Sequence, residues 1–133
     1  EFETYIKPFD LQIMKAIKDA GGYCFLHICK DQLNMDRYKG YDEYADVVNW
    51  GVYEAPFSLE KGRKLFPKSA IMGGLANRHG VLVDGTKEEV EAEVKKVIRE
   101  YGRKGLILGA DCTLATEQDL DKVKAAVLAA RNS

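Results

Sequence analysis

The chain has 133 residues, of which 46% are hydrophobic and 31% are charged, and its formal net charge is −1. This balance is typical of one globular domain with a modest core, and it excludes an intrinsically disordered chain. Acidic and basic residues are interleaved and no hydrophobic run reaches the roughly 20 residues of a membrane span, so neither a nucleic acid nor a membrane is an expected partner.

The first half of the chain alternates between helical and strand-like patterns. Pro8 is well placed to begin a helix in which hydrophobic residues recur at three- and four-residue spacing. Short hydrophobic runs with little alternation follow at 23–28, 45–50 and 70–75. Runs of this kind are typical of buried parallel strands.

Polar residues mark where the intervening helices begin. Ser58 is a candidate N-cap of a short helix ending near residues 66–67, and residues 30–44 are expected to form a loop with a short helix. Thr86 and Glu89 form a capping-box pattern that opens a long helix over 87–101.

A fourth strand and a last helix complete the predicted order. The run 105–109 is the fourth strand, and Thr116 with Asp119 is a weaker capping-box pattern that opens a helix ending near Arg131. The order, one helix followed by four strand–helix units, predicts an α/β fold with a parallel sheet. Two architectures fit: a small doubly wound sheet, or half of a (β/α)₈ (TIM) barrel.

Three side chains at predicted strand ends suggest a metal site. His27 and Cys29 are two residues apart on a strand and so share a face, and Cys112 follows another strand. Catalytic zinc has three protein ligands and one open position, and imidazole and thiolate suit it. In a flat sheet the first and fourth strands would lie about 14 Å apart, so a zinc site requires a curled, barrel-like sheet. The alternative is a strand-end histidine with two thiols that act as small hydrophobic residues.

The cysteine count also bears on the compartment. Three cysteines are an odd number, and no secretory signal opens the chain. Free or metal-bound thiols in a reducing cytoplasm are therefore expected. Cys24 lies three residues before His27 and is expected to face the core.

Other polar residues are candidates because they follow strand ends. Asn49 and Trp50 end the second strand, where they are candidates for substrate binding, although Trp50 fits the core equally well. Arg78 is a candidate clamp for an anionic group, and His79 beside it is a candidate substrate contact. Asp111 is a candidate catalytic residue that orients a ligand or accepts a proton, or it caps the loop backbone.

Four segments, in order, resemble one family. They are Leu-His-Ile-Cys (26–29), Asp-Val-Val-Asn-Trp (46–50), Gly-Gly-Leu (73–75) with Asp-Gly-Thr-Lys-Glu-Glu-Val (84–90), and Leu-Ile-Leu-Gly-Ala-Asp-Cys-Thr-Leu (106–114). This set resembles the C-terminal part of the uroporphyrinogen decarboxylase superfamily. The resemblance implies that residues 1–133 are a single domain from the last four strands of a longer (β/α)₈ barrel.

Two branches of that superfamily imply different chemistry. In cobalamin-dependent, coenzyme M type methyltransferases a His-x-Cys…Cys motif holds Zn²⁺, and His27, Cys29 and Cys112 match it position by position. The implied enzyme moves a methyl group between a thiol and a corrinoid on a partner protein. Uroporphyrinogen decarboxylases need no metal, and Cys112 stands where their loop has a histidine. Decarboxylation of a tetrapyrrole carboxylate is thus the second possibility, and a non-catalytic module that binds a tetrapyrrole or a partner protein is the third.

The chain corresponds to only half of a barrel, and it departs from the motif of the methyltransferase branch at two places. The glycine that usually follows His-x-Cys is Lys30 here, and Gly73-Gly74 replaces a Gly-Asn pair. Four parallel strands would leave two edges and one face bare. The chain is therefore expected to form a homo-oligomer, to rearrange its sheet or to depend on the rest of the barrel.

Overall fold

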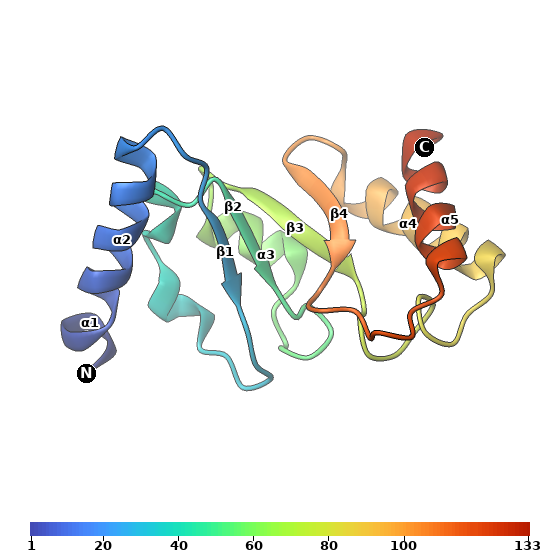
Figure 1. Cartoon of the computed structure of the whole chain (residues 1–133), viewed down its shortest axis with the longest axis horizontal. Coiled ribbons are helices and arrows are strands. Elements are labelled where there is room, and N and C mark those ends of the chain that lie inside the picture. The colour runs from blue at the N-terminus through green and yellow to red at the C-terminus, as the bar shows by residue number, and fades with distance from the viewer.

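The computed structural model describes all residues 1–133 as one parallel sheet with helices around it (Figure 1). Two helices, α1 (Phe2–Tyr5) and α2 (Lys7–Asp19), precede the sheet. Its strands are β1 (Phe25–Ile28), β2 (Val47–Trp50), β3 (Ala70–Leu75) and β4 (Leu106–Ala110). Between and after them lie the 3₁₀ turns η1 (Met35–Tyr38) and η2 (Tyr41–Glu43) and the helices α3 (Leu59–Leu65), α4 (Lys87–Tyr101) and α5 (Leu120–Arg131).

The sheet has the order and direction of half of a (β/α)₈ barrel. The strands follow in sequence order, β1-β2-β3-β4, and every neighbouring pair is parallel. In Figure 1, α3 lies behind the sheet, α2 lies beside β1, and α4 and α5 lie side by side beyond β4. The predicted α/β class and half-barrel architecture are confirmed.

Most helix starts follow the predicted caps, with one exception. The Ser58 hydroxyl accepts a hydrogen bond from Lys61 N–H at 3.2 Å, and Thr86 with Glu89 forms a complete capping box. The pairing of Thr116 with Asp119 is wrong. Asp119 is itself the N-cap and accepts a hydrogen bond from Asp121 N–H at 2.8 Å. An aspartate caps as well as a threonine does, so the helix begins one turn later than predicted.

The core lies between the sheet and the helices behind it. Trp50, Phe66 and Ile71 are fully buried there, and the Trp50 indole N–H donates to Phe57 O at 2.8 Å. Cys24 is buried in the same cluster, as predicted. A second cluster joins the end of β3 to α4 and α5. No helix of the structure is long and hydrophobic enough to cross a membrane.

The other face of the sheet presents a row of residues that the strand register places side by side. His27 pairs with Asn49, Asn49 with Met72, and Met72 with Ile107. None of these side chains is buried, because no helix covers this face. It corresponds to the interior of a complete barrel, and it leads to the carboxyl ends of the strands, where sites form in this fold.

Candidate metal centre

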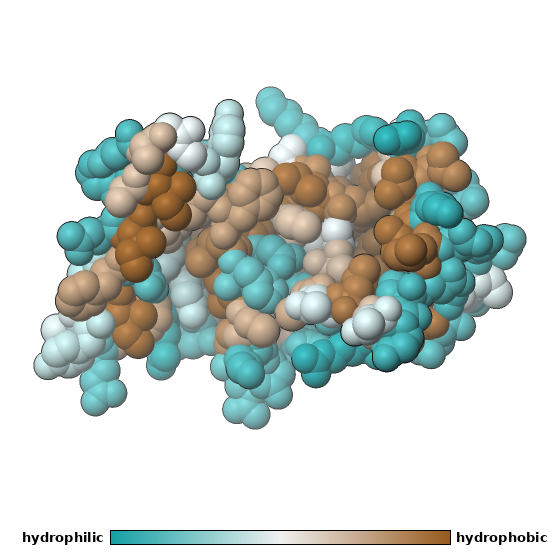
Figure 2. All heavy atoms as spheres, viewed as in Figure 1, coloured by the Kyte–Doolittle hydropathy of each residue, from teal (hydrophilic) through white to brown (hydrophobic).

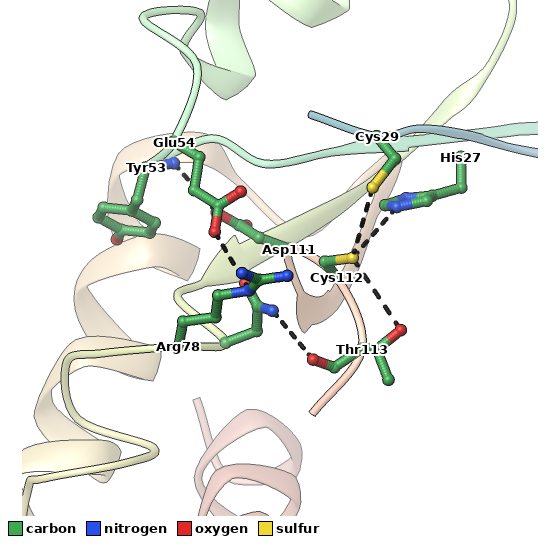
Figure 3. Close-up of polar contacts among 9 residues, drawn as sticks. His27, Cys29, Tyr53, Glu54, Arg78, Asp111, Cys112 and Thr113 are labelled. Atoms are coloured by element: carbon green, nitrogen blue, oxygen red, sulfur yellow. Dashed lines mark hydrogen bonds and ion pairs between the residues drawn. The ribbon is translucent and has the colours of Figure 1, made fainter. Parts of the chain in front are cut away.

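His27, Cys29 and Cys112 converge at the carboxyl ends of β1 and β4. Cys112 Sγ lies 3.3 Å from His27 Nε2 and 3.9 Å from Cys29 Sγ. One ligand atom from each of the three residues lies within 4.8 Å of the other two. Figure 3 shows the three side chains pointing toward one another. The sequence placed these residues at strand ends, and the structure brings them together.

Curvature of the sheet makes this meeting possible. β1 and β4 are the two edge strands and are separated by β2 and β3, a span of about 14 Å in a flat sheet. The observed contact therefore requires that the sheet curls toward its open face and that the residue after Asp111 leans inward. The local geometry is that of a barrel rather than of a flat doubly wound sheet.

The donor set fits a zinc ion. With Zn–S and Zn–N lengths of about 2.3 and 2.1 Å, a tetrahedral ion separates two sulfur ligands by about 3.8 Å and a sulfur from a nitrogen by about 3.6 Å. The observed separations are 3.9 Å between the two Sγ atoms and 3.3 Å between Cys112 Sγ and His27 Nε2. Two sulfurs and one imidazole are soft and borderline donors, which select zinc over magnesium or calcium.

Asp111 holds the strand-end loops against the strand that leads to Cys112. Its side chain is fully buried, and its two carboxylate oxygens accept hydrogen bonds from Tyr53 N–H at 3.0 Å and Gly74 N–H at 3.4 Å. Burial raises the pKa of Asp111 to about 6, while these backbone hydrogen bonds act in the opposite direction. Of the two roles considered for Asp111, this geometry favours capping the loop backbone.

Asn77 was not recognised from the sequence, although it supports the same region. Its side chain is 3% exposed, and its Nδ2 donates to Thr113 O at 2.9 Å. This bond ties the loop after β3 to the residue that follows Cys112. A single asparagine in a polar loop gives no sequence signal for such a role, because only the fold reveals its partner.

Arg78 and His79 lie at exposed positions of the loop after β3. The Arg78 guanidinium forms an ion pair with Glu54 at 3.7 Å and is largely exposed (Figure 3). The His79 ring meets the edge of the Tyr53 ring at 6.4 Å between centroids. Both side chains remain candidates for contact with a substrate, and neither reaches the His27–Cys29–Cys112 cluster through a direct bond.

Asn49 and Trp50 face opposite sides of the sheet, since neighbouring strand residues alternate. Asn49 lies on the open face, and its Oδ1 is 2.5 Å from His27 Nδ1. Trp50 is fully buried against the helices. Of the two possibilities left open for Trp50, the structure supports the core and not the wall of a substrate pocket.

Comparison with known proteins agrees with the fold. The chain forms half of a parallel (β/α)₈ barrel with a candidate His–Cys–Cys metal centre at its strand ends. The sequence model of the uroporphyrinogen decarboxylase (URO-D) family matches residues 1–133, and the chain belongs to this family. No curated protein matches it significantly.

A solved structure of a methyltransferase from Methanosarcina mazei is similar in fold. The TM-score is 0.75 at 20% sequence identity, and the similarity covers 98% of this chain. It covers 36% of the methyltransferase chain, so the sequence spans about a third of that protein.

Proposed function

We propose that the chain is part of a zinc-dependent methyltransferase that moves a methyl group between a corrinoid and a thiol. The convergence of His27 Nε2, Cys29 Sγ and Cys112 Sγ supports this proposal most directly. The match of these three residues to the motif of the methyltransferase branch supports it independently. The decarboxylase branch has no use for two sulfurs and an imidazole at ligand distance.

In this proposal each residue at the strand ends has a distinct task. His27, Cys29 and Cys112 would hold the ion, and three protein ligands are the number that leaves a catalytic zinc one position for a substrate. Zinc bound there would hold a thiol substrate as its thiolate, which is the nucleophilic form. Asp111 and Asn77 keep the loops around Cys112 in place through backbone hydrogen bonds.

Arg78 and His79 are proposed to contact the part of the substrate away from the sulfur. The exposed Arg78 guanidinium offers several donors for an anionic group, and its partner Glu54 keeps it over the loops. The corrinoid would be brought by a partner protein. The carboxyl ends of the strands, where sites open in a complete barrel, are the side from which it would approach.

Metal binding tests the proposal directly. We expect the chain purified under reducing conditions to bind close to one zinc per molecule, and His27→Ala to lose most of that binding. His79→Ala is the matched control, since it removes the only other histidine and leaves the three ligands intact. A zinc content far below one equivalent in the unmodified chain, or equal binding by His27→Ala, would overturn the proposal.

Activity of the complete protein separates the remaining possibilities. Methyl transfer to a thiol that is lost on chelation and restored by zinc would support the proposal. The family description favours decarboxylation of a tetrapyrrole carboxylate as the second candidate. Porphyrinogen turnover that is insensitive to chelation would replace the first candidate with the second.

A further inference from the structure

We infer that Asn49 is a positioning residue that fixes the tautomer and the orientation of His27. This inference rests on the proposed function in so far as it assigns the free imidazole nitrogen to a metal ion. The two residues lie on the open face of the sheet, where the register of β1 and β2 places them side by side.

The Asn49 side-chain amide has only one orientation that satisfies its neighbours. Its Nδ2 lies 2.9 Å from Met72 O and 3.3 Å from Ala110 O. Both of these atoms are carbonyl oxygens, which only accept, so the amide NH₂ must face them. The amide oxygen must then face His27, where Oδ1 lies 2.5 Å from Nδ1.

The orientation of the amide decides the protonation of the imidazole. An amide oxygen only accepts hydrogen bonds, so the neutral His27 ring must carry its proton on Nδ1 and donate it to Asn49. Nε2 is then unprotonated and has a lone pair. Nε2 is also the ring nitrogen that lies 3.3 Å from Cys112 Sγ. The nitrogen that the cluster needs as a ligand is therefore the nitrogen that Asn49 leaves free.

Asn49 also connects β1, which leads from His27 to Cys29, with β4, which leads to Cys112. It lies on β2, contacts His27 on β1, and reaches β3 through Met72 O and β4 through Ala110 O. Ala110 is two residues before Cys112. One side chain thus links all four strands on the open face, and it fixes the curl that brings Cys112 to His27.

These contacts revise the role expected of Asn49. Both hydrogens of its amide are used within the sheet, and its oxygen is used by His27. Asn49 has no free donor for a substrate. Asn49 instead orients His27 through the ring nitrogen that would not bind the metal. Carboxylates and carbonyl oxygens commonly take this role for metal-bound histidines.

The tautomer is measurable without metal or activity. The chain has two histidines, so His79→Gln leaves the His27 ring alone in a ¹⁵N–¹H correlation spectrum recorded at a pH where the imidazole is neutral. We expect the metal-free protein to show protonated Nδ1 and bare Nε2. Asn49→Ala should populate the opposite tautomer, and Asn49→Asp, which keeps the acceptor, should retain the original one.

Folding of the variants is checked in the same sample. The indole N–H of Trp50, the only tryptophan, donates to Phe57 O, so its shifted resonance reports that the end of β2 is intact. If Asn49→Ala loses that resonance, the tautomer of the Asn49-containing protein still decides the inference. Protonated Nε2 in that protein would overturn it.

Zinc affinity provides the second measurement. Loss of an outer hydrogen-bond partner of a ligating histidine weakens metal binding by about 10–100-fold, and we expect a loss of this size for Asn49→Ala. Asn49→Asp should lose less, since it keeps the bond to Nδ1 and gives up those to Met72 and Ala110. Unchanged affinity in folded Asn49→Ala would overturn the inference. Absence of zinc binding in the unmodified chain would instead overturn the proposed function and leave the tautomer result standing.

Discussion

Cys29 and Cys112 are 83 residues apart in the chain, and their Sγ atoms lie 3.9 Å apart at the open end of the sheet. Cys24, by contrast, is buried on the opposite side, where burial raises the pKa of its thiol. The structure therefore separates two accessible thiols from one inaccessible thiol, although Cys24 and Cys29 are close in sequence.

The rates at which the three thiols react should follow this difference in accessibility. In the metal-free native chain we expect Cys29 and Cys112 to react rapidly with a thiol reagent, and Cys24 to react only after unfolding, because a buried thiol is neither accessible nor ionised. Zinc should slow the reaction of the first pair and leave that of Cys24 unchanged. Three equally fast thiols, counted spectrophotometrically, would contradict this arrangement.

The strand and helix pattern was predictable, because hydrophobic runs and caps are local signals. The capping box of Thr86 and Glu89 and the cap at Ser58 were identified correctly. The predicted pairing of Thr116 with Asp119 is wrong, because the spacing of a threonine three residues before an aspartate does not tell which of the two residues is the N-cap.

The candidate site was predictable only in part. Strand ends located His27 and Cys112, but the curl that brings them together depends on contacts across four strands. The role of Asn49 could not be predicted for the same reason, since its partners at Met72 and Ala110 are distant in the chain. Alternation along β2 places Asn49 and Trp50 on opposite faces of the sheet. The structure buries Trp50 in the core, and the residue does not line a substrate pocket.

Lys30 directly follows the candidate ligand Cys29 and has a backbone φ of 112°. An L-residue is strained in this region, at a cost of about 1–3 kcal/mol, and glycine is not. We expect Lys30→Gly to increase the free energy of unfolding by about 1 kcal/mol after the greater freedom of glycine in the unfolded chain is counted. Denaturant titration measures this change. Lys30→Ala is the control: it removes the same charge, keeps the strain and should not stabilise the chain.

Gly62 lies in the interior of α3, where alanine would normally favour a helix by about 1 kcal/mol. A Cβ at this position would lie 1.9 Å from Cη2 of the buried Trp50 ring. We therefore expect Gly62→Ala to lower the free energy of unfolding by about 1–3 kcal/mol, the usual cost of overpacking, despite the gain in helix propensity. Unfolding is followed by Trp50 fluorescence.

Lys61→Ala, at the exposed neighbouring position, is the control and should change the free energy of unfolding by less than about 0.5 kcal/mol. A Gly62→Ala chain that is more stable than the parent would refute the close contact between residue 62 and the Trp50 ring.

Asp46 joins α2 to the beginnings of β1 and β2. Its carboxylate lies 2.6 Å from Lys18 Nζ and accepts a hydrogen bond from Cys24 N–H at 2.7 Å. The hydrogen bond with Lys18, followed by that from Cys24, lowers the pKa of Asp46 below its ordinary value of 3.8. The folded state therefore favours the ionised carboxylate, and its stabilising effect is complete above the unfolded pKa and is lost as the pH falls through the folded pKa.

Asp46→Asn should accordingly be less stable than the parent chain at neutral pH. The difference should begin to shrink as the pH falls below about 4, and it should vanish once the pH is below the lowered pKa of folded Asp46, where both chains carry a neutral group. Thermal unfolding between pH 7 and the acid limit of the folded state measures it. Asp36→Asn, an exposed change on η1, is the control and should show no such trend. A difference that stays constant on acidification would show that the charge of Asp46 does not contribute.

Hydrophobic side chains remain exposed at both ends of the sheet. Each of the edge strands β1 and β4 has only one neighbour. Ile6, which immediately precedes α2, and Phe9 and Ile13 on α2 are each about half exposed, at 49%, 59% and 62%. Figure 2 shows hydrophobic side chains along α2 on the left and around β4 and α5 on the right. Surfaces of this kind pack against further strands and helices in a complete barrel.

We therefore expect the purified chain to self-associate through these edges. Sedimentation or light scattering should show species larger than 14.9 kDa. The double change Phe9→Glu and Ile13→Glu should shift the distribution toward monomer, since it places two charges on the exposed stripe of α2. Gln12→Glu adds charge to an exposed position of the same helix outside the stripe, and it should leave the distribution unchanged. A monomeric parent chain that still binds zinc through His27 would contradict this expectation and would show that four strands hold their curl without any partner.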